Sequence, residues 1–132
     1  MAVEEHQETL TTPHPGGSDP ATWAPEFDAM RAAPDNHRIV FENDRVRVLE
    51  VVQEPHTTEP AHHHRWPSLV CMLEGEHLID HDGATGKVLL DTRDGIGPLE
   101  PMSAVWKEPE ALHFVENPTS TRIRLLRIEI KD

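Results

Sequence analysis

Short runs of alternating apolar and polar residues fill the chain from Arg38 to its C-terminal end. The first two runs, 39–41 and 45–52, flank Asn43-Asp44, a pair that tolerates left-handed backbone and predicts a two-residue hairpin turn. Because no helix-length pattern separates the runs, they predict an antiparallel sandwich or barrel. The further strands expected are 68–74, 77–80, 87–91, 104–107, 111–116 and 122–130.

Two of these runs break their own alternation. The run 45–52 slips by one position at Val48-Leu49, and the run 122–130 does so at Leu125-Leu126. Since a slip of one residue turns every later side chain to the other face of a sheet, we expect a β-bulge or a passage between sheets in both. The shared irregularity also suggests that the two strands lie near one another.

The N-terminal segment has a different pattern. Residues 1–18 carry almost nothing apolar and are expected to form a flexible arm. Trp23, Phe27 and Met30 then fall on one face of a helix, and Pro34 would end that helix. Residues 19–34 are therefore predicted to form a short helical segment. The remaining residues, 35–132, form the predicted β domain.

Composition restricts the partners and the compartment. A chain of 132 residues with a formal net charge of −12 is repelled by phosphate backbones and anionic lipids, so neither nucleic acid nor a membrane is an expected partner. The longest apolar run has five residues, too few to span a bilayer. The single cysteine, Cys71, permits no intrachain disulfide, and the acidic N-terminus resembles no secretory signal. A cytoplasmic protein is therefore expected.

Three consecutive histidines stand before the apolar run at 68–74. In an extended strand His62 and His64 point to one face while His63 points away, and two imidazoles at this spacing can bind one metal ion. His113, on another strand-like run, is the best candidate for a third ligand. His37 falls in a turn and carries no signal of a role in the site, and Glu59, in the loop before the histidines, is expected to be solvated.

These residues resemble the two motifs of the cupin superfamily. The first motif is matched by Pro60-Ala-His62-His63-His64 and, after a strand, Leu73-Glu74-Gly75-Glu76. The second is matched by Pro101 and by His113 with Asn117 behind it. The resemblance covers about residues 38–130. It implies an all-β fold, a cupin-type jelly-roll barrel or double-stranded β-helix, with one metal ion per chain inside it. Carried over to this sequence, the ligands are His62, His64 and His113. Members of the family commonly form homodimers, so a homodimer is expected.

One departure from the family pattern affects the expected chemistry. A glutamate ligand normally follows the second histidine by four or five positions, where this chain has Ser68 and Leu69. Three neutral imidazoles leave a divalent ion with its full charge, which favours an anionic, chelating small-molecule substrate. Such sites resemble those of thiol and diketone dioxygenases, so Fe2+ is the metal expected first, with Zn2+, Mn2+, Ni2+ and Cu2+ as alternatives. Because the chain has no tyrosine, cysteine dioxygenase itself is disfavoured.

Four further residues are candidates for a substrate pocket. Trp66 and Trp106 are expected to wall the barrel mouth from opposite sides, and Ser68 and His77 are the other two candidates. Besides a dioxygenase, two functions stay open: an oxygen-independent metal-dependent isomerase or lyase, and a non-catalytic module that binds a small ligand or a metal. Glu74, Glu108 and Glu110 are expected to be surface charges.

Overall fold

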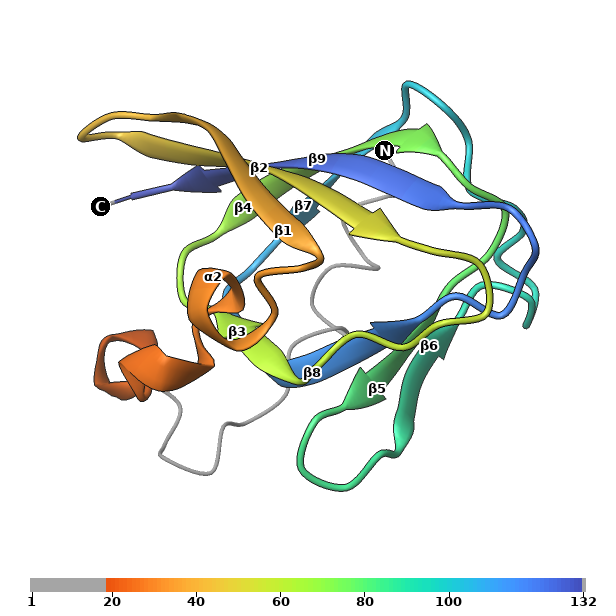
Figure 1. The fold of residues 1–132 in the computed structure, drawn as a ribbon, viewed down its shortest axis with the longest axis horizontal. Helices are drawn as coiled ribbons and strands as arrows, with labels where there is room; N and C mark the ends of the chain where they lie inside the picture. Colours follow the sequence, from red (N-terminus) through yellow and green to blue (C-terminus); the bar gives the residue numbers. More distant parts are fainter. Residues whose placement is uncertain (1–18, 132) are drawn as a thin grey trace.

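The computed structural model describes residues 19–131, and within that range nine strands form two antiparallel sheets (Figure 1). The five-stranded sheet has the order β1-β2-β9-β4-β7, and the four-stranded sheet has the order β3-β8-β5-β6. An all-β jelly-roll architecture is thereby confirmed. The strands are β1 (His37–Glu42), β2 (Val46–Gln53), β3 (His62–His64), β4 (Ser68–Glu74), β5 (Ile79–Asp82), β6 (Val88–Asp91), β7 (Ala104–Lys107), β8 (Glu110–Glu116) and β9 (Ile123–Ile130).

The strands β2 and β9 pair along their whole length without a shift of register. Buried and half-buried residues alternate strictly along both. The bulges expected at Val48-Leu49 and Leu125-Leu126 are therefore wrong, although the expected proximity of the two strands is confirmed. The pattern is interrupted for another reason. Charged residues occupy some of the inward-facing positions, where apolar residues would have kept the alternation regular. These inward-facing charged residues are Arg47, Arg127 and Glu129.

The segment before β1 is not one helix. It consists of two 3₁₀ turns, η2 (Pro20–Thr22) and η3 (Pro25–Phe27), followed by the four-residue helix α2 (Ala29–Ala32). The Asp28 carboxylate caps α2 by accepting a hydrogen bond from Met30 N at 3.1 Å, so a new helix begins where the expected one would have continued. Trp23 is 6% exposed whereas Phe27 is 39% exposed, so the two do not share a buried face. The expected arm, 1–18, lies outside the described residues.

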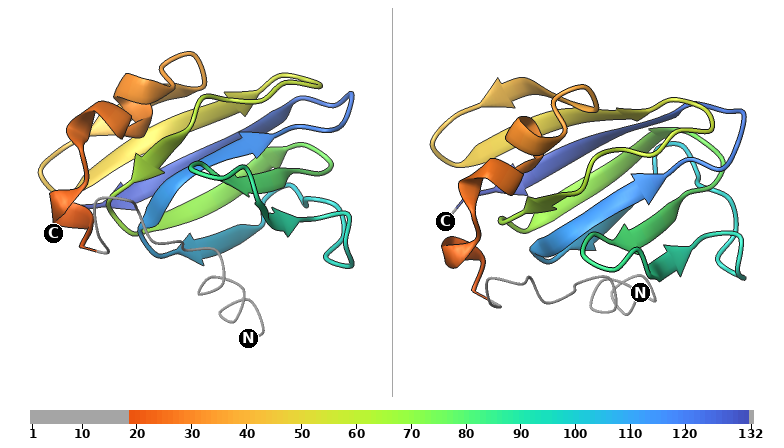
Figure 2. Two further views of the ribbon diagram at one scale, coloured as in Figure 1. Left: turned by 90° about the horizontal axis from the view of Figure 1, so that it is seen from below. Right: turned by 60° about the horizontal axis from the view of Figure 1, so that its bottom comes forward.

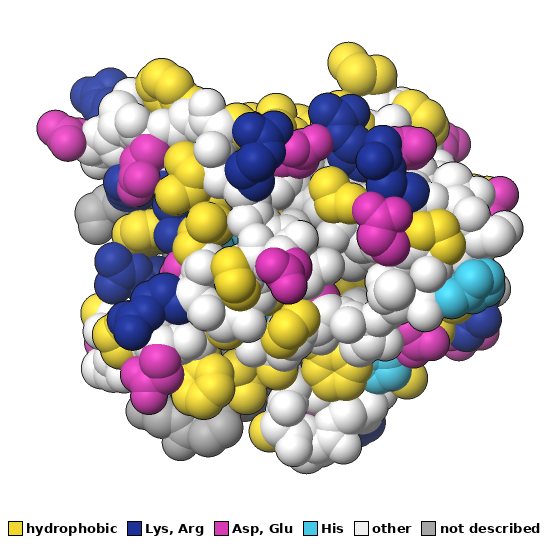
Figure 3. All heavy atoms as spheres, in the orientation of Figure 1, with side chains coloured by type: hydrophobic (Ala, Val, Ile, Leu, Met, Phe, Trp, Pro, Cys, Tyr) yellow, Lys and Arg dark blue, Asp and Glu magenta, His cyan; other side chains and the backbone are white. Residues whose placement is uncertain are grey.

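The segment 19–36 lies at one end of the two sheets, where α2 contacts both β3 and β1 (Figure 2). The turn between β1 and β2 has three residues, 43–45, rather than two, and the Asn43 side chain accepts hydrogen bonds from Arg45 N and Val46 N. On the face in Figure 3, acidic and basic side chains lie among apolar ones. In the range 19–131, the structure contains no helix long and apolar enough to cross a membrane.

The apolar core lies on the inner face of the five-stranded sheet. Each fully buried aliphatic side chain of this kind contributes about 1.5 to 3 kcal/mol of hydrophobic stabilisation. Towards β3 and α2, the same interior changes from aliphatic to imidazole, guanidinium and carboxylate side chains. The aliphatic part consists of Leu49, Val51, Val70, Ile123 and Leu125.

Candidate metal centre and adjoining cavity

Strands β3 and β8 pair so that His62 lies directly opposite His113. The register then shifts, and His64 lies opposite Glu110 rather than Ala111. This irregularity keeps both Glu110 and His113 on the inner face with the two histidines of β3. The His62 ring centroid is 4.9 Å from that of His64 and 4.8 Å from that of His113. The pairing thus brings together the three residues that the sequence selected.

A fourth histidine, His37, belongs to the same cluster, although its position in the sequence carries no signal of a role in the site. It is the first residue of β1, is only 3% exposed, and its ring centroid lies 4.6 Å from that of His62 and 5.5 Å from that of His64. One ligand atom from each of His37, His62 and His64 falls within 4.8 Å of the others. These three nitrogens can therefore bind one ion. The two motifs gave no indication of His37, because it belongs to neither motif and only the position of β1 in the fold brings it beside them.

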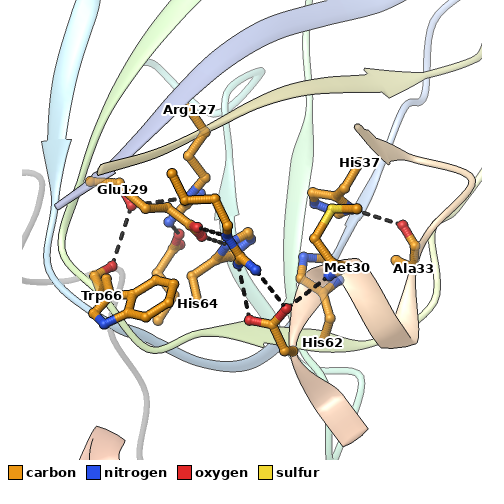
Figure 4. A network of polar contacts seen from close by, with 12 residues as sticks. Met30, Ala33, His37, His62, His64, Trp66, Arg127 and Glu129 are labelled. Carbon is orange, nitrogen blue, oxygen red and sulfur yellow. Dashed lines mark hydrogen bonds and ion pairs between the residues drawn. The ribbon is translucent and has the colours of Figure 1, made fainter. Parts of the chain in front are cut away.

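All four rings are oriented in the same way. Each Nδ1 lies within hydrogen-bonding distance of an oxygen, so that it donates its proton there; in a neutral ring this leaves the lone pair on Nε2. The Nε2 atoms of His62 and His113 are buried and have no hydrogen-bond partner within the described range. Figure 4 shows His37, His62 and His64 with Met30 and Ala33 of the N-terminal segment beside them. The Nδ1 contacts are His37 to Ala33 O at 2.9 Å, His62 to Pro60 O at 2.8 Å, His64 to Glu129 Oε2 at 2.9 Å and His113 to Asp80 Oδ1 at 2.7 Å.

The electrostatic surroundings keep most of these rings neutral. Burial lowers the pKa of His37 to about 4, and burial is also the main cause that moves the pKa of His62 and His64 well below 6.5. Burial opposes the charged form of His113 as well, but Asp80 and Glu110 outweigh it and raise the pKa of this ring to about 9. A proton on its Nε2 would find no acceptor among residues 19–131. A divalent cation fits that position better, because the same carboxylates attract it and Nε2 can bind it.

Beyond the rings, Glu129 connects the cluster to the N-terminal segment. This buried carboxylate accepts hydrogen bonds from His64 Nδ1 and from Arg47 Nε, and the other two guanidinium nitrogens of Arg47 donate to Asp28. Since Asp28 also caps α2, the orientation of His64 is tied to the position of that helix. Such partners of ligating histidines normally fix the ring and raise its basicity.

Ser68, which stands where the family pattern has a glutamate, lies beside a buried ion pair. Ser68 accepts a hydrogen bond from Arg127 Nε at 3.2 Å, and Arg127 pairs with Glu110. Glu110 is 3% exposed, so its assignment as a surface charge is wrong. Burial disfavours its charged form, but Arg127 and His113 outweigh burial and lower the pKa of Glu110 to about 2. Ser68 therefore contributes to holding Arg127 and is not placed as a ligand.

Glu59 also differs from its expectation, because its side chain is buried rather than solvated. It lies 3.8 Å from His62 Nε2 through Oε2 and 4.0 Å from His37 Nε2 through Oε1. Gln53 Nε2 and Val115 N each donate a hydrogen bond of 2.9 Å to it. Burial raises the pKa of Glu59 to about 7.

A cavity of about 400 Å³ adjoins the histidine cluster between the two sheets. His113 lines it and at the same time contacts His62 and His64, so this ring lies between the cavity and the rest of the cluster. Most of the wall is aliphatic, and the segment 96–100 completes it. The polar end consists of Asp80, Lys107, Glu110, His113 and Arg127, and the aliphatic wall includes Val70, Met72, Leu78, Leu90, Leu99, Val105, Val115 and Leu125.

The four residues expected to form a pocket do not line this cavity. Trp66 instead lies under Arg65, whose guanidinium carbon is 4.4 Å from the ring centroid, and Trp106 Nε1 donates to Glu108 at 2.7 Å. His77 Nδ1 lies 2.9 Å from Thr92 Oγ1. Ser68, as described above, holds Arg127.

His63 faces away from the cluster, as the strand alternation predicts. Its Nε2 lies 2.8 Å from Ala24 O, and its ring centroid is 5.2 Å from the Trp23 ring. It is nevertheless buried, because the segment before β1 covers the outer side of β3. The outward-facing histidine of the triplet therefore helps to dock this segment.

No family model and no curated protein matches the sequence. Solved structures do match. A cupin domain from Bordetella pertussis Tohama I is 21% identical, with 73% of this chain and 92% of that chain covered and a TM-score of 0.61. A conserved protein with a double-stranded β-helix domain from Klebsiella pneumoniae is 15% identical, and the match covers 98% of this chain and 87% of that chain with a TM-score of 0.52. The polyketide cyclase RemF from Streptomyces resistomycificus has a TM-score of 0.52 as well, with 17% identity over 80% of this chain and 72% of that chain. At these identities the similarity establishes the fold alone.

Proposed function

We propose that this chain, which has the double-stranded β-helix fold of a small cupin domain, is a metal-dependent enzyme acting on a small organic anion. His37, His62 and His64 would hold one divalent ion, and His113, whose ring contacts those of His62 and His64, is the candidate for a further ligand. One observation carries the proposal: four buried imidazoles direct the same nitrogen inward, and two of those nitrogens have no other partner in residues 19–131. Buried polar atoms without partners are rare in proteins unless a ligand completes them.

The substrate class follows from charge and shape. A bound divalent ion would supply Lewis acidity and a place for an anionic oxygen or sulfur of the substrate. Imidazole ligands do not reduce the charge of that ion, so an anionic substrate is favoured. The aliphatic wall of the adjoining cavity suits an apolar body, and Lys107 and Arg127 at its polar end would orient further oxygen atoms. A small, largely apolar carboxylate, enolate or thiolate meets these requirements.

We further propose iron(II) and a dioxygenase reaction, which adds both atoms of O2 to the substrate and needs no external reductant. The support is the histidine-only set from the two motifs together with the missing glutamate at Ser68. The test is oxygen uptake by iron-loaded protein over a panel of thiols and 1,3-dicarbonyl compounds, with the metal-free protein as control. Absence of uptake across the panel would rule out this version.

An oxygen-independent reaction is the second candidate, favoured by the position of His113. This ring lines the cavity and is hydrogen-bonded to Asp80, an arrangement suited to moving a proton on a bound substrate. In that case His37, His62 and His64 would hold the ion, and His113 would act as acid or base. The cyclase among the structures of similar fold is consistent with such chemistry.

The two candidates differ in a measurable way. If His113 is a ligand, His113→Ala reduces the metal content of the purified protein as His62→Ala does. If His113 moves a proton, His113→Ala keeps the metal and loses turnover, and turnover by the unchanged chain survives strict anaerobiosis. A chain that binds metal but turns over no substrate under either condition would be a non-catalytic binding module.

A further inference from the structure

We infer that Glu59 is an additional, carboxylate ligand of the metal centre, in the place of the glutamate that is missing at Ser68. The inference rests on the proposed metal site and deepens it. It changes the formal charge of the loaded centre from +2 to +1, so the favoured substrate is a monoanion rather than a dianion.

The distances permit coordination. Ligand atoms bound at about 2.1 Å from an ion can be at most about 4.2 Å apart. Glu59 Oε2 is 3.8 Å from His62 Nε2, and Glu59 Oε1 is 4.0 Å from His37 Nε2. Both separations lie below that limit, so one ion can contact Oε2 together with His62, or Oε1 together with His37.

Glu59 differs from the other buried glutamates of the site in having only histidines as charged partners. The two other buried glutamates near the cluster each have an arginine partner: Arg127 for Glu110 and Arg47 for Glu129. In the described part of the chain, no arginine or lysine forms an ion pair with Glu59. Its hydrogen-bond donors are two neutral groups, Gln53 Nε2 and Val115 N. Because an unpaired buried carboxylate is costly, a cation is expected beside it.

The local backbone holds Glu59 firmly in this position. Its own N–H donates to Val115 O at 3.2 Å, while Val115 N donates to its side chain. Each carboxylate oxygen accepts one hydrogen bond and keeps a lone pair free. Glu59 is therefore a preorganised donor three residues before His62, attached to the strand that carries His113.

The experiment compares Co2+ binding by the full chain and its variants Glu59→Gln, Glu59→Asp and Glu116→Gln. Co2+ affinity is measured by competition with a chelator, and the visible absorption of the bound ion reports the ligand set. Glu116→Gln is the matched control, since Glu116 is a glutamate on β8 that pairs with His81 outside the cluster. Gln53 can rotate its amide to face the new amide of Glu59→Gln, so this variant keeps its hydrogen bonds.

We expect Glu59→Gln to bind Co2+ about 10- to 100-fold more weakly, with a changed visible spectrum, and Glu116→Gln to stay within about twofold of the unchanged chain. Glu59→Asp, which retains the charge at a shorter reach, should fall between them. An unchanged spectrum and an affinity within about threefold for Glu59→Gln would overturn the inference while leaving the histidine site intact.

A crystal structure of the Zn2+-loaded, unchanged chain provides a second measurement that needs no variant to fold. A carboxylate oxygen of Glu59 within about 2.5 Å of the ion supports the inference, and one beyond about 3 Å overturns it. If the unchanged chain binds neither Co2+ nor Zn2+, the proposed function fails together with the inference, so the two failures are distinguishable.

Discussion

Replacing Glu129 by glutamine tests whether the groups behind the rings control metal binding. The carboxylate of Glu129 accepts one hydrogen bond from Arg47 and one from His64 Nδ1. A glutamine has only one accepting oxygen, and its amide N–H₂ cannot face the guanidinium of Arg47 without losing that bond. The oxygen will therefore face Arg47 and the amide nitrogen will face His64. His64 must then accept at Nδ1, which places its proton on Nε2, where the metal would bind.

The magnitude follows from this change of tautomer. Loss of a hydrogen-bonded partner behind a ligating histidine typically weakens metal binding about 10- to 100-fold, equivalent to about 1.4 to 2.7 kcal/mol. Arg47 keeps Asp28 as an anionic partner, so we expect the metal-free variant to lose only about 1 to 3 kcal/mol of stability and to remain folded.

Two measurements check the prediction. Chelator competition gives the metal affinity, and nitrogen NMR of the histidine rings in the metal-free protein gives the tautomer of His64. Glu50→Gln is the control, since Glu50 also pairs with arginines, Arg38 and Arg124, but lies outside the cluster. The reasoning is refuted if Glu129→Gln binds metal as tightly as the unchanged chain, or if its His64 ring keeps the proton on Nδ1.

Three further predictions concern the cluster and the cavity. The pKa of His37 is lowered to about 4 in the folded chain. Between pH 6.5 and 4 the unfolded chain therefore binds a proton at this ring and the folded chain does not. The metal-free protein should lose stability as the pH falls through that range. His37 alone accounts for about 3 kcal/mol of this loss at pH 4, and thermal unfolding of His37→Gln should show a shallower pH dependence than the unchanged chain. Val105→Trp should fill the cavity and abolish turnover while metal content stays the same; unchanged turnover would place the substrate elsewhere. His62→Ala should bind metal at least about 10-fold more weakly than His63→Ala, and equal affinities would contradict the assignment of the inward face.

The fold could be predicted in outline because its signals are local. Alternation within each run and turn residues between runs need only neighbours in sequence, and the strands at 68–74 and 104–107 begin and end as expected. Local geometry also gave the orientation of the histidine triplet, since a strand turns His62 and His64 to one side and His63 to the other. The strand pairing then brought His113 beside them.

The buried charges were not predictable in the same way. A polar residue at an inward position is indistinguishable in sequence from a shift of register, and Arg47, Arg127 and Glu129 therefore made two regular strands look irregular. Whether such a residue faces solvent or the interior depends on the partner that neutralises it. Those partners lie far along the chain, as for Arg47 with Glu129 and Arg127 with Glu110.

By itself, then, the sequence determined a two-sheet β-fold and the inward direction of two metal-binding candidates, because both depend on the two-residue period of a strand. The tertiary structure decided that His37 and Glu59 lie beside them and that the cavity is lined by His113 rather than by Trp66 and Trp106. The physical reason is that a buried polar site is a set of mutually compensating groups from separate strands. Only the packing of the two sheets brings those groups within bonding distance.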